Sequence, residues 1–230
     1  MKKICLLLIC LMITSCATNQ AYLSSSSLSV PSAPSVLLLP IEASVFENQA
    51  LSESEPLAIE SESLYENLEK GLIDFMFDNG IEPIPYGQKI IKDEHLSILN
   101  EAAIMVDAVD SYNNKKQSRF YGLSKDSIEQ LNSYSASYVL LVEYDERIPS
   151  GGKMALDMLM VMAGYNARPY DQSFRFAMFD LRNGELVWAF TQRFGQGDGS
   201  SGTVAQPLHN AKPKKLARNI NIIMKEFPLQ

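Results

Sequence analysis

Three cysteines of this 230-residue chain could take part in covalent chemistry: Cys5, Cys10 and Cys16. A thiolate can bind a metal or act as a nucleophile, so the fate of each cysteine matters. Residues 1–15 combine a basic start, an apolar core and small residues at the end, which is the pattern of a secretory signal peptide. The apolar run is shorter than the ~20 residues that span a bilayer. We expect residues 1–15 to be removed, which leaves Cys16 as the only cysteine of the mature chain.

Cys16 completes the sequence Ile13-Thr14-Ser15-Cys16, which resembles the bacterial lipobox. The resemblance implies that Cys16 is acylated and that cleavage occurs just before it. The alternative is a plain secreted protein, but an exported chain with one unpaired thiol is unusual. Ala17 stands where aspartate often marks retention at the inner membrane of enteric bacteria. We therefore expect a lipid anchor in the outer membrane, with the folded domain facing the periplasm.

The sequence offers few other residues that could form a metal site or a catalytic site. His95 and His209 are the only histidines, and neither lies at ligand spacing from a second histidine or a free cysteine. We expect both to be solvated, and we expect no metal site. No serine lies in a GxSxG elbow, and no carboxylate pair is singled out as general acid and base. The sequence therefore predicts no catalytic activity.

Residues 197–202 match the GxGxxG string of dinucleotide-binding loops. That mechanism also requires a helix that starts at the third glycine, followed by a parallel strand. Here Pro207 intervenes and the chain ends after one further helix. We interpret the string as a flexible loop and expect no cofactor.

The formal net charge is −7, or −7 − 2 = −9 once Lys2 and Lys3 are removed. This balance argues against a nucleic-acid-binding protein, which normally carries a basic face. Acidic residues gather between Glu42 and Glu82, and basic residues between Lys212 and Lys225. We interpret these runs as solvated helix faces, and a dedicated binding surface is the alternative.

The chain divides into three parts. After the signal peptide, residues 16–35 are rich in serine, alanine and proline, which is typical of a flexible tether. Residues 36–230 have the length of one domain with a substantial core.

Hydrophobic spacing predicts the elements of this domain. A buried first strand covers Val36–Ile41, an acidic loop follows, and a helix begins near Pro56 or Glu60 and stops at Asn79-Gly80. Residues 81–86 carry two prolines, which suits an edge strand. Further helices are expected over 93–108, from Ser124 and from Pro213, and residues 138–144 form the expected central strand.

Two alternating segments around Asn183-Gly184 predict a tight β-hairpin with a two-residue turn, and this hairpin carries the only tryptophan, Trp188. The order of elements predicts an α/β fold: a single domain with a mixed β-sheet of about four to five strands flanked by helices, ending in a β-hairpin and a C-terminal helix.

Residues 154–163 hold four of the ten methionines: Met154, Met158, Met160 and Met162. Three interpretations remain open. The segment is a buried helix in which methionine fills irregular gaps, an adaptable surface for a partner protein, or a contact with the bilayer.

The lipobox, the Val36–Pro40 strand, the Ala136–Val142 strand and the final hairpin over Asp180–Trp188 recur in one group of bacterial lipoproteins. Their order is similar to that of the curli-secretion lipoproteins, the lipoprotein activators of penicillin-binding proteins and the N-terminal domain of the Tol–Pal component TolB. The resemblance implies an outer-membrane-anchored, non-catalytic domain that docks to envelope proteins or assembles rings. Residues 154–163 lack the alternation of the barrel-forming insertions in the curli-secretion lipoproteins.

We therefore expect a lipid-anchored adaptor or assembly factor, with Cys16 as its anchor and the methionines as possible partner contacts. The alternatives are a carrier with a lipid or small-ligand pocket beneath the methionine-rich segment, a subunit of a homo-oligomeric secretion assembly, and, more remotely, a hydrolase. The sequence does not identify the partner.

Overall fold

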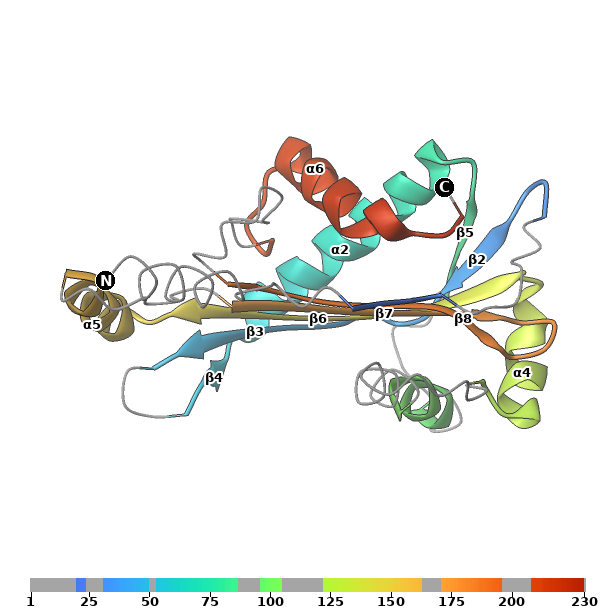
Figure 1. Cartoon of the computed structure of the whole chain (residues 1–230), viewed down its shortest axis with the longest axis horizontal. Helices are drawn as coiled ribbons and strands as arrows, with labels where there is room; N and C mark the ends of the chain where they lie inside the picture. The colour runs from blue at the N-terminus through green and yellow to red at the C-terminus, as the bar shows by residue number, and fades with distance from the viewer. Residues whose placement is uncertain are drawn as a thin grey trace, which may run out of the picture.

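Figure 1 shows the computed structural model of the chain. The structure describes residues 20–23, 31–49, 53–86, 96–104, 122–162, 171–195 and 208–229. One long mixed sheet lies between two helical layers, with α2 and α6 on one face and α4 and the helix at residues 96–104 on the other (Figure 1). The predicted fold class, a single α/β domain with a mixed sheet and a C-terminal helix, is confirmed.

The elements have the following bounds. The strands are β1 Gln20–Leu23, β2 Ser35–Leu38, β3 Glu42–Asn48, β4 Glu55–Pro56, β5 Glu82–Pro85, β6 Tyr138–Pro149, β7 Asp171–Asp180 and β8 Leu186–Gly195. The helices are α2 Ala58–Asp78, α4 Lys125–Leu131, α5 Gly151–Met162 and α6 Pro213–Ile223, with short 3₁₀ turns η1 Asn132–Tyr134 and η2 Met224–Glu226. The sheet thus holds more strands in the described part of the chain than the four to five expected.

The central strand of the sheet is β6, as predicted. The strand order is β1-β8-β7-β6-β2-β5, and β3 pairs with both β6 and β4. β2 and β3 both run parallel to β6, the first beside residues 138–140 and the second beside residues 143–149. They are separated at Pro40, which cannot donate a ladder hydrogen bond.

The prediction of an acidic loop after residue 41 is wrong, because β3 occupies this segment. β6 is twelve residues long, and β3 pairs with the half of it that β2 leaves free. Val45 of β3 is buried while Glu42 is exposed, so Glu42 lies on the face of the strand opposite to Val45.

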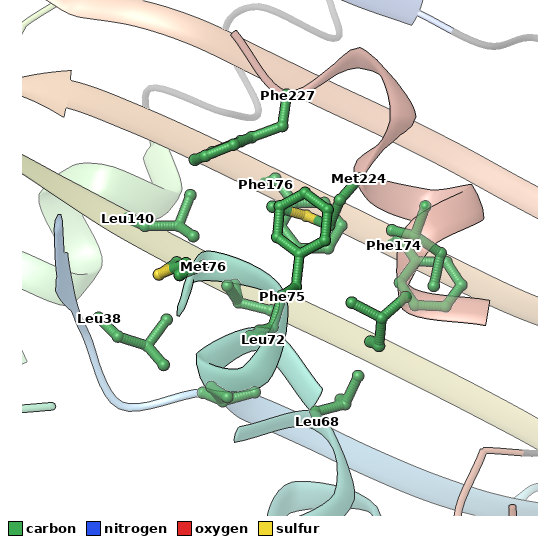
Figure 2. Packing of buried hydrophobic residues seen from close by; sticks show 14 of the residues in the cluster. Leu38, Leu68, Leu72, Phe75, Met76, Leu140, Phe174, Phe176, Met224 and Phe227 are labelled. Atoms are coloured by element: carbon green, nitrogen blue, oxygen red, sulfur yellow. The ribbon is translucent and has the colours of Figure 1, made fainter. Parts of the chain in front are cut away.

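The main core lies between the sheet and the helices α2 and α6. Figure 2 shows side chains of α2, of the strands and of the C-terminal segment gathered in one cluster. The predicted helix face is buried, as are the inward side chains of α6: Leu64, Leu68, Leu72, Phe75, Leu216, Ile220 and Ile223. Trp188 meets Phe227 edge-on with ring centroids 5.3 Å apart, so the C-terminus closes over the sheet.

The second core lies under α4 and residues 96–104. Ile98 and Ala102 are buried against the strand residues Leu37, Val139 and Leu141 in one cluster. Glu101 joins the two helices, because its Oε1 accepts a 2.5 Å hydrogen bond from the backbone N–H of Ser124, the N-cap of α4.

The predicted hairpin is present as β7 and β8, but its turn is longer than two residues. The backbone N–H of Asp180 donates to the Glu185 carbonyl (2.9 Å), which leaves four residues in the loop. Gly184 has a positive φ of 75° and Asn183 does not. The Leu123 N–H donates to the Gly184 carbonyl (2.9 Å), so the approach of α4 shapes this loop.

The predicted tether also contains regular structure. Gln20–Leu23, within residues 16–35, form β1 and pair antiparallel with β8. Because a strand of four residues is short and polar at one end, its partner rather than its own pattern determines it.

Candidate docking helix and a buried polar cluster

The methionine-rich segment forms the helix α5, which is inserted between two antiparallel strands. β6 ends at Pro149, α5 begins at Gly151, and β7 returns from Asp171. Ser150 starts the helix, because its Oγ accepts a hydrogen bond from the Lys153 N–H (3.2 Å). In Figure 1 α5 lies beyond one end of the sheet, away from α2, α4 and α6.

Most apolar side chains of α5 are exposed to solvent. Met158 is 69% exposed, Leu159 63% and Met162 81%, and Met154, Leu156 and Met160 are also exposed. The buried-helix interpretation is therefore wrong within this chain, because α5 projects past the sheet end and no described core surface extends to it. The partner-facing and membrane-facing interpretations remain.

The polar side of α5 is narrow. Lys153 Nζ lies 3.0 Å from Asp157 Oδ1, an ion pair one turn apart. At about 100° per residue, the six exposed apolar side chains spread over about 240° of the circumference, and this pair lies in the remaining arc. An apolar surface this wide is unusual on a helix that faces only water.

A group of polar side chains surrounds Glu146 of β6. The sequence pattern did not single out Glu146. Glu146 is fully buried. Its Oε2 accepts hydrogen bonds from the Tyr144 hydroxyl (3.0 Å) and the Leu208 N–H (2.9 Å), and its Oε1 lies 2.7 Å from His209 Nδ1. All three partners can donate, which suits an ionised carboxylate that only accepts.

His209 is therefore not solvated as expected, because its side chain is only 13% exposed and is paired with Glu146. The hydrogen bond to Glu146 raises the pKa of His209, partly offset by burial, and the charge of Glu60 raises it further. Burial, followed by the charge of Glu146, raises the pKa of Tyr144 well above its usual value of 10.0.

This cluster holds the chain before α6 onto the rest of the fold. Ser63 Oγ donates to the His209 carbonyl (2.8 Å), and Asn67 Nδ2 donates to the Leu208 carbonyl (3.1 Å). A general acid and base must reach a substrate, whereas Glu146 is enclosed and its oxygens are occupied. The arrangement suits a structural role.

Charged side chains lie on the face of the sheet that α4 packs against, in the part of β6 and β7 that α4 does not cover. Glu143 and Arg175 are cross-strand neighbours and form an ion pair. Asp145 and Arg147 follow on the same face of β6 and are exposed. We call this region, Glu143, Asp145, Arg147 and Arg175, the charged sheet face.

Some of the residues that the sequence pattern singled out, namely Cys16, His95 and residues 197–202, lie outside the described residues. Within the described ranges, no group of three or more His, Cys, Asp or Glu side chains could hold a metal ion, and no helix is long and apolar enough to cross a membrane. A cavity of about 50 Å³ lies between α2 and α6, lined by Gly71 and Ile220 among others.

Comparison with known proteins gives low similarity. No protein family matches the sequence and no curated protein is similar to it. The structure is similar to one chain of a PelC point variant, solved as a dodecamer, from Paraburkholderia phytofirmans, with 13% identity over 90% of this chain and 98% of that chain (TM-score 0.41). It is also similar to the LpoB C-terminal domain from Salmonella enterica (11% identity, 74% and 88% covered, TM-score 0.30) and to lipoprotein GNA1162 from Neisseria meningitidis (11%, 71% and 81%, TM-score 0.31). These are similarities of fold at low sequence identity.

Proposed function

We propose that this protein is a lipid-anchored, non-catalytic adaptor or assembly factor of the bacterial cell envelope. Cys16 is the anchor, and α5 is a docking element whose Met154, Met158, Met160 and Met162 contact another envelope component. Outer-membrane location, with the domain in the periplasm, follows from the lipobox and Ala17.

The exposure of α5 is the observation that carries this proposal. Large apolar side chains gathered on one element, here Met158, Leu159 and Met162, mark an interaction site in soluble proteins. Methionine suits such a surface because its flexible thioether side chain adapts to different partners. The enclosure of Glu146 supports a non-catalytic role.

The carrier alternative receives no support from the cavity between α2 and α6. Its volume of about 50 Å³ is far below the ~300 Å³ of the smallest common ligand pockets. It also lies away from α5, where the alternative requires a pocket.

In-cell photo-cross-linking of the full-length protein tests the adaptor function. A photoreactive residue is placed at position 145 on the charged sheet face, at position 158 on α5, and at position 129 on α4 as the reference. We expect irradiation to attach a defined envelope protein at position 145 or 158. The proposal would be overturned if the amount of cross-linked product were the same at all three positions. It would also be overturned if that amount were the same with and without irradiation. Adducts between copies of this chain alone would favour the homo-oligomeric alternative.

A further inference from the structure

The strand β1 determines where the anchor lies relative to α5. β1 is antiparallel to β8, with Gln20 opposite Thr191 and Leu23 opposite Trp188, so the N-terminal end of β1 is the end nearer to Gly195 of β8. Gly195 lies opposite Asp171 of β7, and Asp171 lies opposite Arg147 of β6. This is the end of the sheet at which β6 leads into α5.

The distance from β1 to the anchor is short. Only Ala17, Thr18 and Asn19 separate Cys16 from Gln20, so the four residue steps span at most about 13 Å. The same number of steps separates Thr191 from Gly195 along β8. An acyl chain on Cys16 therefore holds the α5 end of the sheet close to the membrane surface.

The width of the apolar surface on α5 indicates that lipid, rather than a groove in a protein, covers this helix. A helix in a protein groove uses anchors at i, i+3, i+4 and i+7, which share one face. Met154, Leu159 and Met160 instead point to separate sides of α5, and all are exposed. Hydrocarbon can surround such a helix, while the Lys153–Asp157 pair lies in the narrow polar arc.

The length of α5 is consistent with entry into one leaflet. Its twelve residues measure about 18 Å at the α-helical rise, which is below the ~30 Å of bilayer hydrocarbon. A helix of this length is too short to span the bilayer, so it would enter one leaflet only.

We propose that α5 inserts into the periplasmic leaflet of the outer membrane beside the lipid on Cys16, so that the sheet stands end-on to the bilayer. This inference rests on the proposed function, since it names the envelope component that α5 contacts. Protein partners then meet the parts of the domain that face away from the membrane.

Fluorescence of the lipidated full-length protein in vesicles tests the insertion. Because lipidation occupies the Cys16 sulfur, Met158→Cys provides the one reactive thiol for a polarity-sensitive dye. The matched control, Glu129→Cys, places the dye on α4. The vesicles contain phosphatidylethanolamine and phosphatidylglycerol, with or without brominated acyl chains, and thermal unfolding confirms that both variants are folded.

We expect the dye at position 158 to shift to shorter wavelengths and to lose emission with brominated lipid, while the dye at position 129 reports water in both vesicles. The inference is overturned if the dye at position 158 stays in water while the protein is vesicle-bound. It is equally overturned if that dye leaves water without being quenched by brominated lipid, which would indicate a protein cover. Cross-linking at position 145 reports separately on the adaptor function, so either proposal can fail alone.

Discussion

Oε1 of Glu146 lies 2.7 Å from Nδ1 of His209, and the Glu146 side chain is fully buried. The pair joins the central strand to the turn before α6. Ser63 and Asn67 of α2 bind the carbonyl groups of the same turn, so both the central strand and α2 hold this turn in place.

The free energy of unfolding should depend on pH through His209. The pKa of His209 is raised in the folded state, first by the hydrogen bond to Glu146. A raised folded pKa contributes stability that is fully present below the unfolded pKa of about 6.5 and is lost as the pH rises through the folded pKa. The stability difference between wild type and His209→Gln, measured by urea unfolding from pH 5.5 upward, should therefore shrink as pH rises. A difference that stays constant would contradict this account.

Removing the buried carboxyl group of Glu146 should be far more damaging than removing an exposed one. Glu146→Ala leaves the Tyr144 hydroxyl, the Leu208 N–H and His209 Nδ1 without their acceptor. Loss of one partner of a buried pair costs about 3 to 5 kcal/mol, and we expect a loss of that order in urea unfolding. Glu129→Ala, at an exposed position of α4, should change stability by no more than about 0.5 kcal/mol. Equal effects of the two substitutions would rule out the role of Glu146.

Sequence periodicity predicts the elements that bury a continuous face. The spacing of Leu64, Leu68 and Leu72 predicts α2 because each faces the same core. The run over Tyr138–Tyr144 predicts a central strand because both of its faces are covered. β1 and β3 escaped prediction because strands with several polar residues are fixed by the partner strand rather than by their own pattern.

The candidate site depends on contacts that one sequence does not contain. Glu146 and His209 are 63 residues apart, and neither residue type nor local spacing links them. The methionine pattern of α5 is the same whether the helix is buried or exposed. Its exposure follows from its place beyond the sheet end, which only the fold reveals.

Gly184 should be far less replaceable than Gly80. Both have positive φ, 75° and 71°, so alanine costs about 1 to 2 kcal/mol at either position. A Cβ at Gly184 would also lie 2.5 Å from Ile128 Cδ1 and 2.9 Å from the Leu123 carbonyl oxygen, whereas a Cβ at Gly80 meets nothing within 4 Å. Overpacking adds about 1 to 3 kcal/mol. Thermal unfolding of Gly184→Ala and Gly80→Ala should separate the two, and equal losses would contradict the contact with α4.

Replacing three methionines of α5 should leave the fold intact. Met158, Met160 and Met162 are exposed, and surface substitutions usually change stability by less than about 0.5 kcal/mol each. The combined change to serine should therefore give nearly wild-type urea unfolding in detergent. A loss of several kcal/mol would indicate that α5 is covered by its own chain.

Cys16→Ser should separate the two attachments to the membrane. Because the expected cleavage also requires Cys16, residues 1–15 are replaced in this variant by a secretory signal peptide that is cleaved without it. Without the acyl chains, α5 is then the membrane contact that remains under our proposal, and a single short apolar element binds reversibly. We expect the Cys16→Ser protein to partition partly into the membrane fraction of cell extracts and to wash off on dilution. Adding the three methionine-to-serine changes should release it completely, whereas the same changes in the lipidated protein should leave it bound. Firm membrane attachment of Cys16→Ser through repeated washing would show that Cys16 is not the anchor.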